Sequence, residues 1–384
     1  MFDQTIQILG KLISFPTISS DSNLALIDWV ADYVAGHGAH VEISHDASGT
    51  KGNLFATFGP MIDGGIILSG HSDVVPTTGQ AWSRDAFTLH ESGGLYYGRG
   101  ACDMKGFIAC ALALAPQLAQ AGLSKPIHIA LSYDEETGCL GAPVMLAALA
   151  ARGLRPGICI VGEPTSMRLI NGHKGCCEMH TVLGGLEGHS SMPAAGVNAA
   201  VYAARYIGQL MEIAEALKAR APADSPFDPP QTTLNVGRLA AGVATNVIPN
   251  HAEIDWEYRP VQLDDIAFVK TRINDFANNV LLPEMRATHP GASIETRTIA
   301  EVVGLEPETE GAAQKLVLAL TGANTTATVP FGTEAGLFAA QGISTVVCGP
   351  GDIAQAHKPD EFVSGEQLRQ CLTMLERLLA RVSA

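Results

Sequence analysis

The pattern of apolar and polar positions in the first part of the chain alternates between two periods. Short runs of β-branched residues, typical of buried strands, are separated by longer segments in which apolar residues recur at helical spacing. Strands that alternate with helices indicate an α/β layer structure with a largely buried sheet. The predicted strands are Ile66–Leu68, Ile127–Leu131 and Ile158–Val161, and the predicted helices are Gly106–Ala121 and Ala142–Ala151.

The alternation of strands and helices stops at about Gly175 and resumes after about Glu301, where a helix over 311–320, a strand Ser344–Cys348 and a final helix are expected. Between Gly175 and Glu301 the order is strand, helix, two strands, helix, strand. This is the order of a ferredoxin-like α+β sandwich, which can be inserted into another domain. The segments are strands Cys177–Val182, Thr232–Leu239, His251–Tyr258 and Ser293–Ile299, with helices Asn198–Ala219 and Asp264–Val280. We predict a two-part α/β domain (residues 1–175 and 292–384), with a mixed central sheet covered by helices on both faces, and an inserted lid or dimerisation domain (residues 176–291).

Charge and composition exclude several classes of protein. The 24 Lys+Arg against 39 Asp+Glu give a net charge of −15, without a basic cluster, which argues against a nucleic-acid partner. The longest apolar run, Phe107–Ala115, is far shorter than the roughly 18 residues of a membrane span. The first residues lack the pattern of a secretory signal, so we expect a cytoplasmic protein. Eight cysteines without a Cys-x-x-Cys pair exclude zinc-finger and redox motifs.

Potential metal ligands follow most of the predicted strands of the α/β domain. In α/β sheets, ligands bind at the carboxyl ends of strands, so these side chains are expected to converge. Histidines and acids without thiolates suit zinc, cobalt or manganese. They are too many for one tetrahedral ion with an open position, and fit two ions about 3.5–4 Å apart that share a carboxylate. The residues are His71, Asp73, Asp103, Glu135, Glu136, Glu163 and His357.

The adjacent pair Glu135-Glu136 requires a division of roles. Two neighbouring carboxylates in one metal shell repel each other, so one is expected to bind metal while the other acts as general base toward water. A single acid or histidine is usually only a surface or hydrogen-bonded residue. The interpretation therefore depends on the conjunction of all these residues at strand ends, which favours a hydrolytic dimetal site.

Five motifs, spread over nearly the whole chain, carry a family resemblance. They are Ser69–Pro76, Gly98–Gly106, Asp134–Gly138, Gly162–Thr165 and Gly188–Pro193. Together they resemble the co-catalytic zinc amidohydrolases and peptidases of the aminoacylase and carboxypeptidase G type. Within this family, Phe331–Gly336 and Cys348–Glu361 most resemble the enzymes that deacetylate N2-acetyl-L-ornithine.

The resemblance implies roles for the residues of the α/β domain. One ion is expected on His71 and Glu163, the other on Glu136 and His357, with Asp103 bridging them. Asp73 is expected to orient His71, and Glu135 to act as general base. A cis peptide bond is expected at Asp103-Met104.

The resemblance also implies roles outside the metal site. His189 in the lid is similar to a family histidine that reaches the neighbouring subunit's active site and stabilises the oxyanion, so a homodimer is expected. Asn246 and Arg259 resemble groups that hold the substrate carboxylate, although Arg259 at a strand end is also compatible with a surface charge. Thr333 and Glu334 are expected near the substrate. Glu334 either faces a side-chain ammonium or caps a helix starting near Ala335.

The implied activity is hydrolysis of N2-acetyl-L-ornithine to L-ornithine and acetate, a step of arginine biosynthesis, with two divalent ions, zinc or cobalt, as cofactors. Two alternatives belong to the same family: desuccinylation of succinyl-diaminopimelate, and broader N-acyl amino-acid or dipeptide hydrolysis. A third alternative, from a different class, is an inactive, metal-free binding homologue. It requires loss of a ligand or the base, and the sequence retains them all.

Overall fold

The computed structural model describes residues 1–383, which form two compact units. The first comprises residues 1–172, 307–328 and 333–383, and the second comprises residues 173–306 and 329–332. The predicted boundary at 291/292 differs from this division, because strand β14 (Ser293–Val302) pairs with β9 (Cys176–Gly184) of the second unit. No helix in the described chain combines the length and apolar character needed to cross a membrane.

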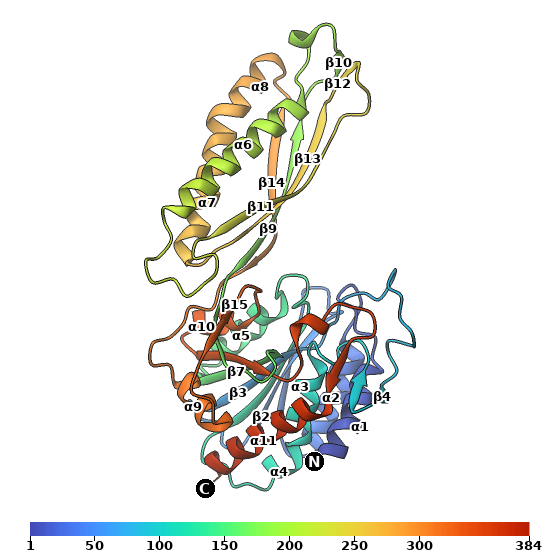
Figure 1. The fold of residues 1–384 in the computed structure, drawn as a ribbon, viewed down its shortest axis with the longest axis vertical. Coiled ribbons are helices and arrows are strands. Elements are labelled where there is room, and N and C mark those ends of the chain that lie inside the picture. Colours follow the sequence, from blue (N-terminus) through green and yellow to red (C-terminus); the bar gives the residue numbers. More distant parts are fainter. Residues whose placement is uncertain (384) are drawn as a thin grey trace. The chain divides into compact units, whose positions relative to one another are not determined.

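The first unit is built on an eight-stranded mixed sheet with the order β1-β2-β6-β3-β7-β16-β8-β15 (Figure 1). Strands β6, β3, β7 and β16 run parallel, whereas β1, β2 and β8 pair with their neighbours in antiparallel fashion. The sheet strands are β1 (His40–His45), β2 (Gly52–Phe58), β3 (Ile66–His71), β6 (Ile127–Ser132), β7 (Ile158–Pro164), β8 (Ile170–His173), β15 (Ala327–Val329) and β16 (Ser344–Gly349).

Helices cover both faces of this sheet, as predicted. Alternate strand residues such as Ile66 and Leu68 pack in one core with helices α1, α2, α3, α9 and α11, while α5 and α10 contact each other and the strands on the opposite side. A small sheet of β4 (His90–Ser92), β5 (Leu95–Tyr97) and β17 (Phe362–Ser364) lies beside them. The helices are α1 (Phe2–Ile13), α2 (Leu24–Gly36), α3 (Lys105–Ala113), α4 (Ala115–Leu118), α5 (Gly141–Ala151), α9 (Ala312–Thr321), α10 (Ala335–Ala340) and α11 (Gly365–Val382), with a 3₁₀ turn η3 (Ile353–Gln355).

The last helix shows how local sequence positions an element of this unit. Ser364 Oγ accepts a hydrogen bond from the Gln367 amide and caps α11. The Gln367 side chain does not return this bond to the Ser364 amide. Its Oε1 accepts from the Gly351 amide instead, which ties the helix start to the turn that follows β16.

The second unit is a four-stranded antiparallel sheet, in the order β11-β13-β9-β14, with helices packed on one face. Buried residues of α6 at helical spacing, such as Ala203, Tyr206 and Leu210, meet alternate residues of β13, such as Ile254 and Trp256. The chain order of the main elements is the predicted βαββαβ. The elements are β9, β10 (Gly188–His189), η1 (Pro193–Ala195), α6 (Ala199–Lys218), β11 (Thr233–Ala241), β12 (Val247–Ile248), β13 (His251–Arg259), α7 (Leu263–Phe276), the π-turn η2 (Ala277–Leu281), α8 (Leu282–Thr288) and β14.

Candidate metal centre

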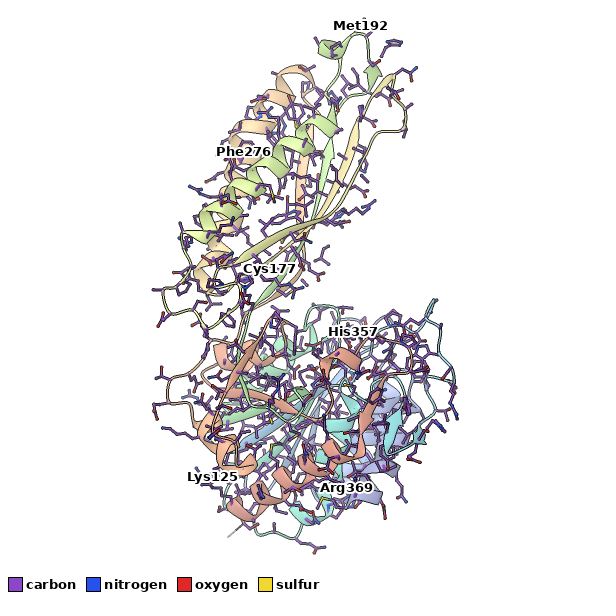
Figure 2. The ribbon with its side chains drawn as sticks, in the orientation of Figure 1. Lys125, Cys177, Met192, Phe276, His357 and Arg369 are labelled. Atoms are coloured by element: carbon purple, nitrogen blue, oxygen red, sulfur yellow. The ribbon has the colours of Figure 1, made fainter. Side chains whose placement is uncertain are left out.

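The four parallel strands of the first unit deliver the acids and histidines to one edge of the sheet. His71 is the last residue of β3, Glu163 lies near the end of β7, and Glu135 and Glu136 follow β6. His357, which is labelled in Figure 2, follows β16. Because β6, β3, β7 and β16 are neighbours in this order and parallel, their carboxyl ends lie side by side. The structure therefore brings together side chains that are nearly 300 residues apart in sequence.

Asp103 lies between the two histidines, in the loop that leads into α3. Its Oδ1 is 3.0 Å from His71 Nε2, and its Oδ2 is 3.3 Å from His357 Nε2. Each oxygen of this carboxylate thus faces a different imidazole. This is the arrangement required of a carboxylate that bridges two cations, one on each oxygen.

Each histidine has a second carboxylate beside it. Glu163 Oε1 is 3.8 Å from His71 Nε2, and Glu136 Oε2 is 3.0 Å from His357 Nε2. These distances place Glu163 beside His71 and Glu136 beside His357. Ligand atoms of Glu136 also lie within 4.8 Å of His71 and Asp103, and those of Glu135 within 4.8 Å of His71 and Glu163, so the acids form one continuous cluster around the two histidines.

The donor set fits divalent cations. Asp103 and Glu163 are 6% and 4% exposed, and they share the pocket with Glu135 and Glu136, so four acids meet only two imidazoles. Glu163 Oε1 is buried and has no hydrogen-bond partner among the described residues. Buried carboxylates are costly unless a cation or donor compensates them, and oxygen and imidazole donors suit zinc, cobalt and manganese. Two ions would supply the missing positive charge.

Asp73 organises the backbone of the site as well as His71. His71 Nδ1 donates to the Asp73 backbone carbonyl at 2.9 Å, with the Asp73 carboxylate 3.5 Å away. That carboxylate accepts from the amides of Glu135 (3.1 Å) and Glu136 (3.3 Å), and from Ser19 Oγ (2.7 Å). The predicted orienting role is therefore wider than expected: Asp73 fixes a histidine and the Glu135-Glu136 segment together. Ser19 was not expected, since no local pattern distinguishes this loop serine.

The electrostatics of the site show how strongly its charges interact. Burial lowers the pKa of His71, but the Asp103 and Asp73 carboxylates outweigh this effect and hold that pKa well above its usual range. Hydrogen bonding to Asp103 and Glu136 raises the pKa of His357 to about 10. Burial raises the pKa of Glu135 to about 8 and raises the pKa of Glu163 well above normal. Cations bound here favour the ionised acids and oppose these carboxylate shifts.

The peptide bond between Asp103 and Met104 is cis, as the resemblance implies. Helix α3 begins at the next residue, Lys105, so the cis bond lies exactly where the chain passes from the candidate bridging residue into the helix. The expectation of a cis bond at this position is confirmed.

Glu334 and Thr333 lie at the start of α10, which begins at Ala335 as expected, but the Glu334 side chain makes neither of the two contacts considered for it. Glu334 is 1% exposed, and its two oxygens accept from Ser69 Oγ and Ser132 Oγ, each at 2.6 Å. Its side chain caps no helix amide in the described chain, whereas Thr333 Oγ1 accepts from the Ala335 amide. Because Glu334 is enclosed by serines of β3 and β6, the structure does not support its contact with a substrate ammonium, and the capping alternative falls to Thr333. Thr333 is equally buried.

The remaining predicted residues belong to the second unit. His189 is exposed on β10, and its Nδ1 lies 2.7 Å from Ser191 Oγ. Asn246 is exposed in the loop before β12. Arg259, at the end of β13, is paired with Glu257 at 3.0 Å, so its charge is already partly compensated.

Comparison with known proteins identifies the family of the chain. Residues 67–381 match the model of peptidase family M20/M25/M40. The chain is 36% identical to an acetylornithine deacetylase of Myxococcus xanthus over 97% of its own length and 96% of that protein. It is 34% identical to an acetylornithine deacetylase of Pasteurella multocida, with 98% and 97% covered.

Solved structures agree with this placement at the level of the fold. A metallo-carboxypeptidase of the M20 family from Sulfolobus solfataricus superposes with a TM-score of 0.76 at 16% identity, with 98% of each chain covered. A dinuclear metal-binding M20 peptidase from Bacillus subtilis gives 0.65 at 16% identity, with 100% of this chain and 98% of that one covered. The protein described here is thus a metal-dependent amidohydrolase that belongs to peptidase family M20/M25/M40.

Proposed function

We propose that the protein hydrolyses the amide bond of N2-acetyl-L-ornithine to L-ornithine and acetate, as a step of arginine biosynthesis. The observation that carries this proposal is the identity of 34–36% over nearly the whole chain to two enzymes named acetylornithine deacetylase. The donor set around Asp103 supports it, because amide hydrolysis at neutral pH needs an activated water and a stabilised oxyanion.

Five residues are proposed to hold two divalent ions, zinc or cobalt. His71 and Glu163 would bind one ion, His357 and Glu136 the other, and Asp103 both, in accordance with the distances around Asp103. Bound there, the ions supply Lewis acidity, which lowers the pKa of water and polarises the amide carbonyl.

Glu135 is proposed to move the proton. Its carboxylate lies close to His71 and Glu163, and its backbone is anchored on Asp73. Glu135 is assigned to neither ion by the family resemblance. It takes a proton from the attacking water and delivers it to the departing amine nitrogen, so one side chain acts first as base and then as acid.

Residues of the second unit are proposed to act on the rest of the substrate. His189, an exposed side chain, would donate to the oxyanion from a neighbouring subunit, which requires a homodimer. Asn246 and Arg259 would hold the substrate carboxylate, and Arg259 must then exchange its partner Glu257 for the ligand. We further propose a cytoplasmic location, in line with a biosynthetic role.

The substrate is tested by comparing kcat/KM for N2-acetyl-L-ornithine, N-succinyl-diaminopimelate and a panel of N-acetyl amino acids and dipeptides, with the purified enzyme loaded with Zn²⁺ or Co²⁺. The proposal predicts that acetylornithine is preferred by at least about tenfold, equivalent to about 1.4 kcal/mol in transition-state binding. A preference for the succinyl substrate, or equal turnover across the panel, would contradict it.

A further inference from the structure

A buried ion pair outside the proposed ligands joins the two segments that carry Asp103 and His357. Arg99 Nη1 donates to Glu361 Oε2 at 2.7 Å, and both side chains are 1% exposed. Arg99 lies four residues before Asp103, and Glu361 lies four residues after His357. The pair therefore bridges the two loops from which the bridging aspartate and one histidine project.

The second oxygen of Glu361 holds the backbone of the aspartate. Glu361 Oε1 accepts from the amides of Cys102 at 2.9 Å and Asp103 at 3.0 Å. Two successive amides on one carboxylate oxygen fix the orientation of the peptide plane that precedes the Asp103 side chain. The backbone carbonyl of Glu361 also accepts from the Gly98 amide at 2.9 Å. Glu361 therefore holds both ends of the segment over residues 98–103.

The other end of Arg99 leads to the histidine. Arg99 Nη2 donates to Gln80 Oε1 at 2.5 Å, and Gln80 Nε2 donates to the backbone carbonyl of His357 at 2.8 Å. One continuous set of hydrogen bonds thus runs from the Asp103 amide through Glu361, Arg99 and Gln80 to His357. None of the three connecting side chains belongs to the proposed ligand set.

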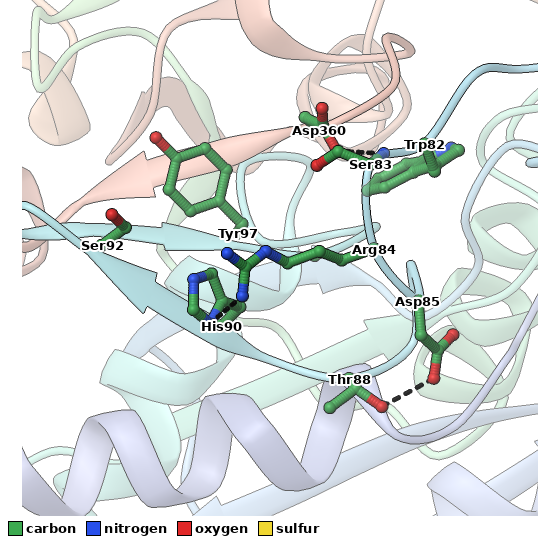
Figure 3. A pocket seen from close by; sticks show the side chains of 10 residues that line it. Trp82, Ser83, Arg84, Asp85, Thr88, His90, Ser92, Tyr97 and Asp360 are labelled. Carbon is green, nitrogen blue, oxygen red and sulfur yellow. Dashed lines mark hydrogen bonds between the residues drawn. The ribbon is translucent and has the colours of Figure 1, made fainter.

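Trp82 and Ser83 support this set of contacts from the outside. The Arg99 guanidinium lies 5.0 Å over the Trp82 ring, and Trp82 Nε1 donates to Gln80 Oε1 at 3.0 Å. Ser83 donates to Asp360 through both its amide and its hydroxyl, next to Glu361. Trp82, Ser83 and Asp360 line a surface cavity of about 280 Å³, shown in Figure 3 with the Ser83–Asp360 contact.

Stability alone does not account for this pair. Taking two charges out of water costs several kcal/mol, and well-packed apolar residues of similar volume often stabilise a protein as much or more. The pair also adds one more carboxylate to a pocket that already has an excess of acids, and Arg99 neutralises it. What an apolar pair could not supply is the acceptor for the Cys102 and Asp103 amides and the donor for Gln80.

We propose that Arg99 and Glu361 are positioning residues that hold Asp103 and His357 at the separation two cations require, and so set the cation affinity of the enzyme. The proposal rests on the dimetal site assigned under the proposed function. Partners that orient metal ligands in this way typically contribute 10–100-fold to metal affinity.

The test is a titration of the chelator-treated, full-length protein with Co²⁺, followed by calorimetry and by the visible absorption of the bound ion. The variants are Glu361→Gln, which removes the charge, and Arg99→Lys, which keeps the charge but loses the two-pronged geometry. Glu284→Gln is the matched control, because it removes an exposed ion pair with Arg205 in the other unit. We expect a 10–100-fold higher Kd and an altered Co²⁺ spectrum for both site variants, and wild-type values for the control.

The outcomes separate this proposal from the proposed function. If the wild-type protein binds no Co²⁺ at the proposed ligands, the dimetal site itself is overturned. Wild-type binding of two ions, with Kd values of both variants within twofold, would overturn only the positioning role and leave a purely structural ion pair. Should either variant fail to fold, Gln80→Leu removes the link to His357 at a half-buried position, and it is expected to weaken one of the two ions; an unchanged Kd would again refute the proposal.

Discussion

Replacing Glu135 with glutamine isolates the proposed proton transfer from metal binding. The amide has nearly the shape of the carboxylate, so the backbone bond from Glu135 N to Asp73 at 3.1 Å can remain. What disappears is the group that accepts a proton from water. Because Asp103, Glu136, Glu163 and both histidines are unchanged, the two donor sets stay complete.

The size of the effect follows from the role. A positioned general base contributes about 10²–10⁴-fold to a rate, which corresponds to roughly 2.7–5.4 kcal/mol at about 1.36 kcal/mol for each factor of ten. Burial raises the pKa of Glu135 to about 8, and a carboxylate whose pKa is raised toward neutrality is a stronger proton acceptor than an ordinary one. We expect kcat to fall by at least about 100-fold, with the KM changed much less.

The assay combines steady-state hydrolysis of N2-acetyl-L-ornithine with metal analysis of the same preparation. Glu136→Gln is the matched control, because it alters the neighbouring carboxylate. It is expected to reduce the cation content, since it removes a proposed ligand of the ion that His357 also binds. Retained activity in Glu135→Gln would refute the role as base. Loss of a cation in this variant would show instead that Glu135 is a ligand, which its closeness to His71 and Glu163 allows geometrically.

Three further predictions test other parts of the structure. Asp73→Ala removes the acceptor of the half-buried Glu135 and Glu136 amides and leaves Ser19 Oγ only the Val74 carbonyl at 3.4 Å, at roughly 1 kcal/mol for each lost contact, so denaturant unfolding should show a loss of about 2 kcal/mol or more; a loss below 1 kcal/mol would contradict the contacts seen. Burial lowers the pKa of His128 from 6.5 to about 4, so the unfolded chain takes up this proton first, and the unfolding free energy should fall by about 3 kcal/mol between pH 6.5 and pH 4 on this account. Metal-free His128→Gln should show a shallower decrease than metal-free wild type over this window, and equal slopes would exclude the effect. Chelation should abolish turnover and lower the Tm, since a ligand at 100 times its Kd stabilises the native state by about 2.7 kcal/mol; an unchanged Tm would argue against binding at this centre.

Much of the fold could be predicted because hydrophobic periodicity determines which residues a sheet or helix buries. The strands that lead to His71, Glu163 and the acids at 134–136 are buried runs, and parallel pairing then brings their ends together. The second domain boundary was placed wrongly. The order of elements already assigned the strand over 293–299 to the inserted sandwich, and its pairing with β9 shows that the boundary lies after this strand and not before it.

The supporting residues could not be inferred in the same way. An acid before a helix gives the same local signal whether it caps the helix, meets a ligand or, like Glu334, accepts from two serines inside the sheet. Likewise, Arg99 and Glu361 stand in recognisable motifs, yet nothing in their spacing shows that they form a buried pair. Which polar side chain finds which partner depends on tertiary packing, so these contacts emerge only from the structure.

The most direct measurement is a crystal structure of the protein loaded with Co²⁺ or Zn²⁺, with the ions located by anomalous diffraction. Two ions are expected about 3.5–4 Å apart, with one Asp103 oxygen on each, His71 and Glu163 on one side, and Glu136 and His357 on the other. A single ion, or ions bound away from Asp103 in a preparation that hydrolyses the amide, would contradict a dimetal site at this sheet edge.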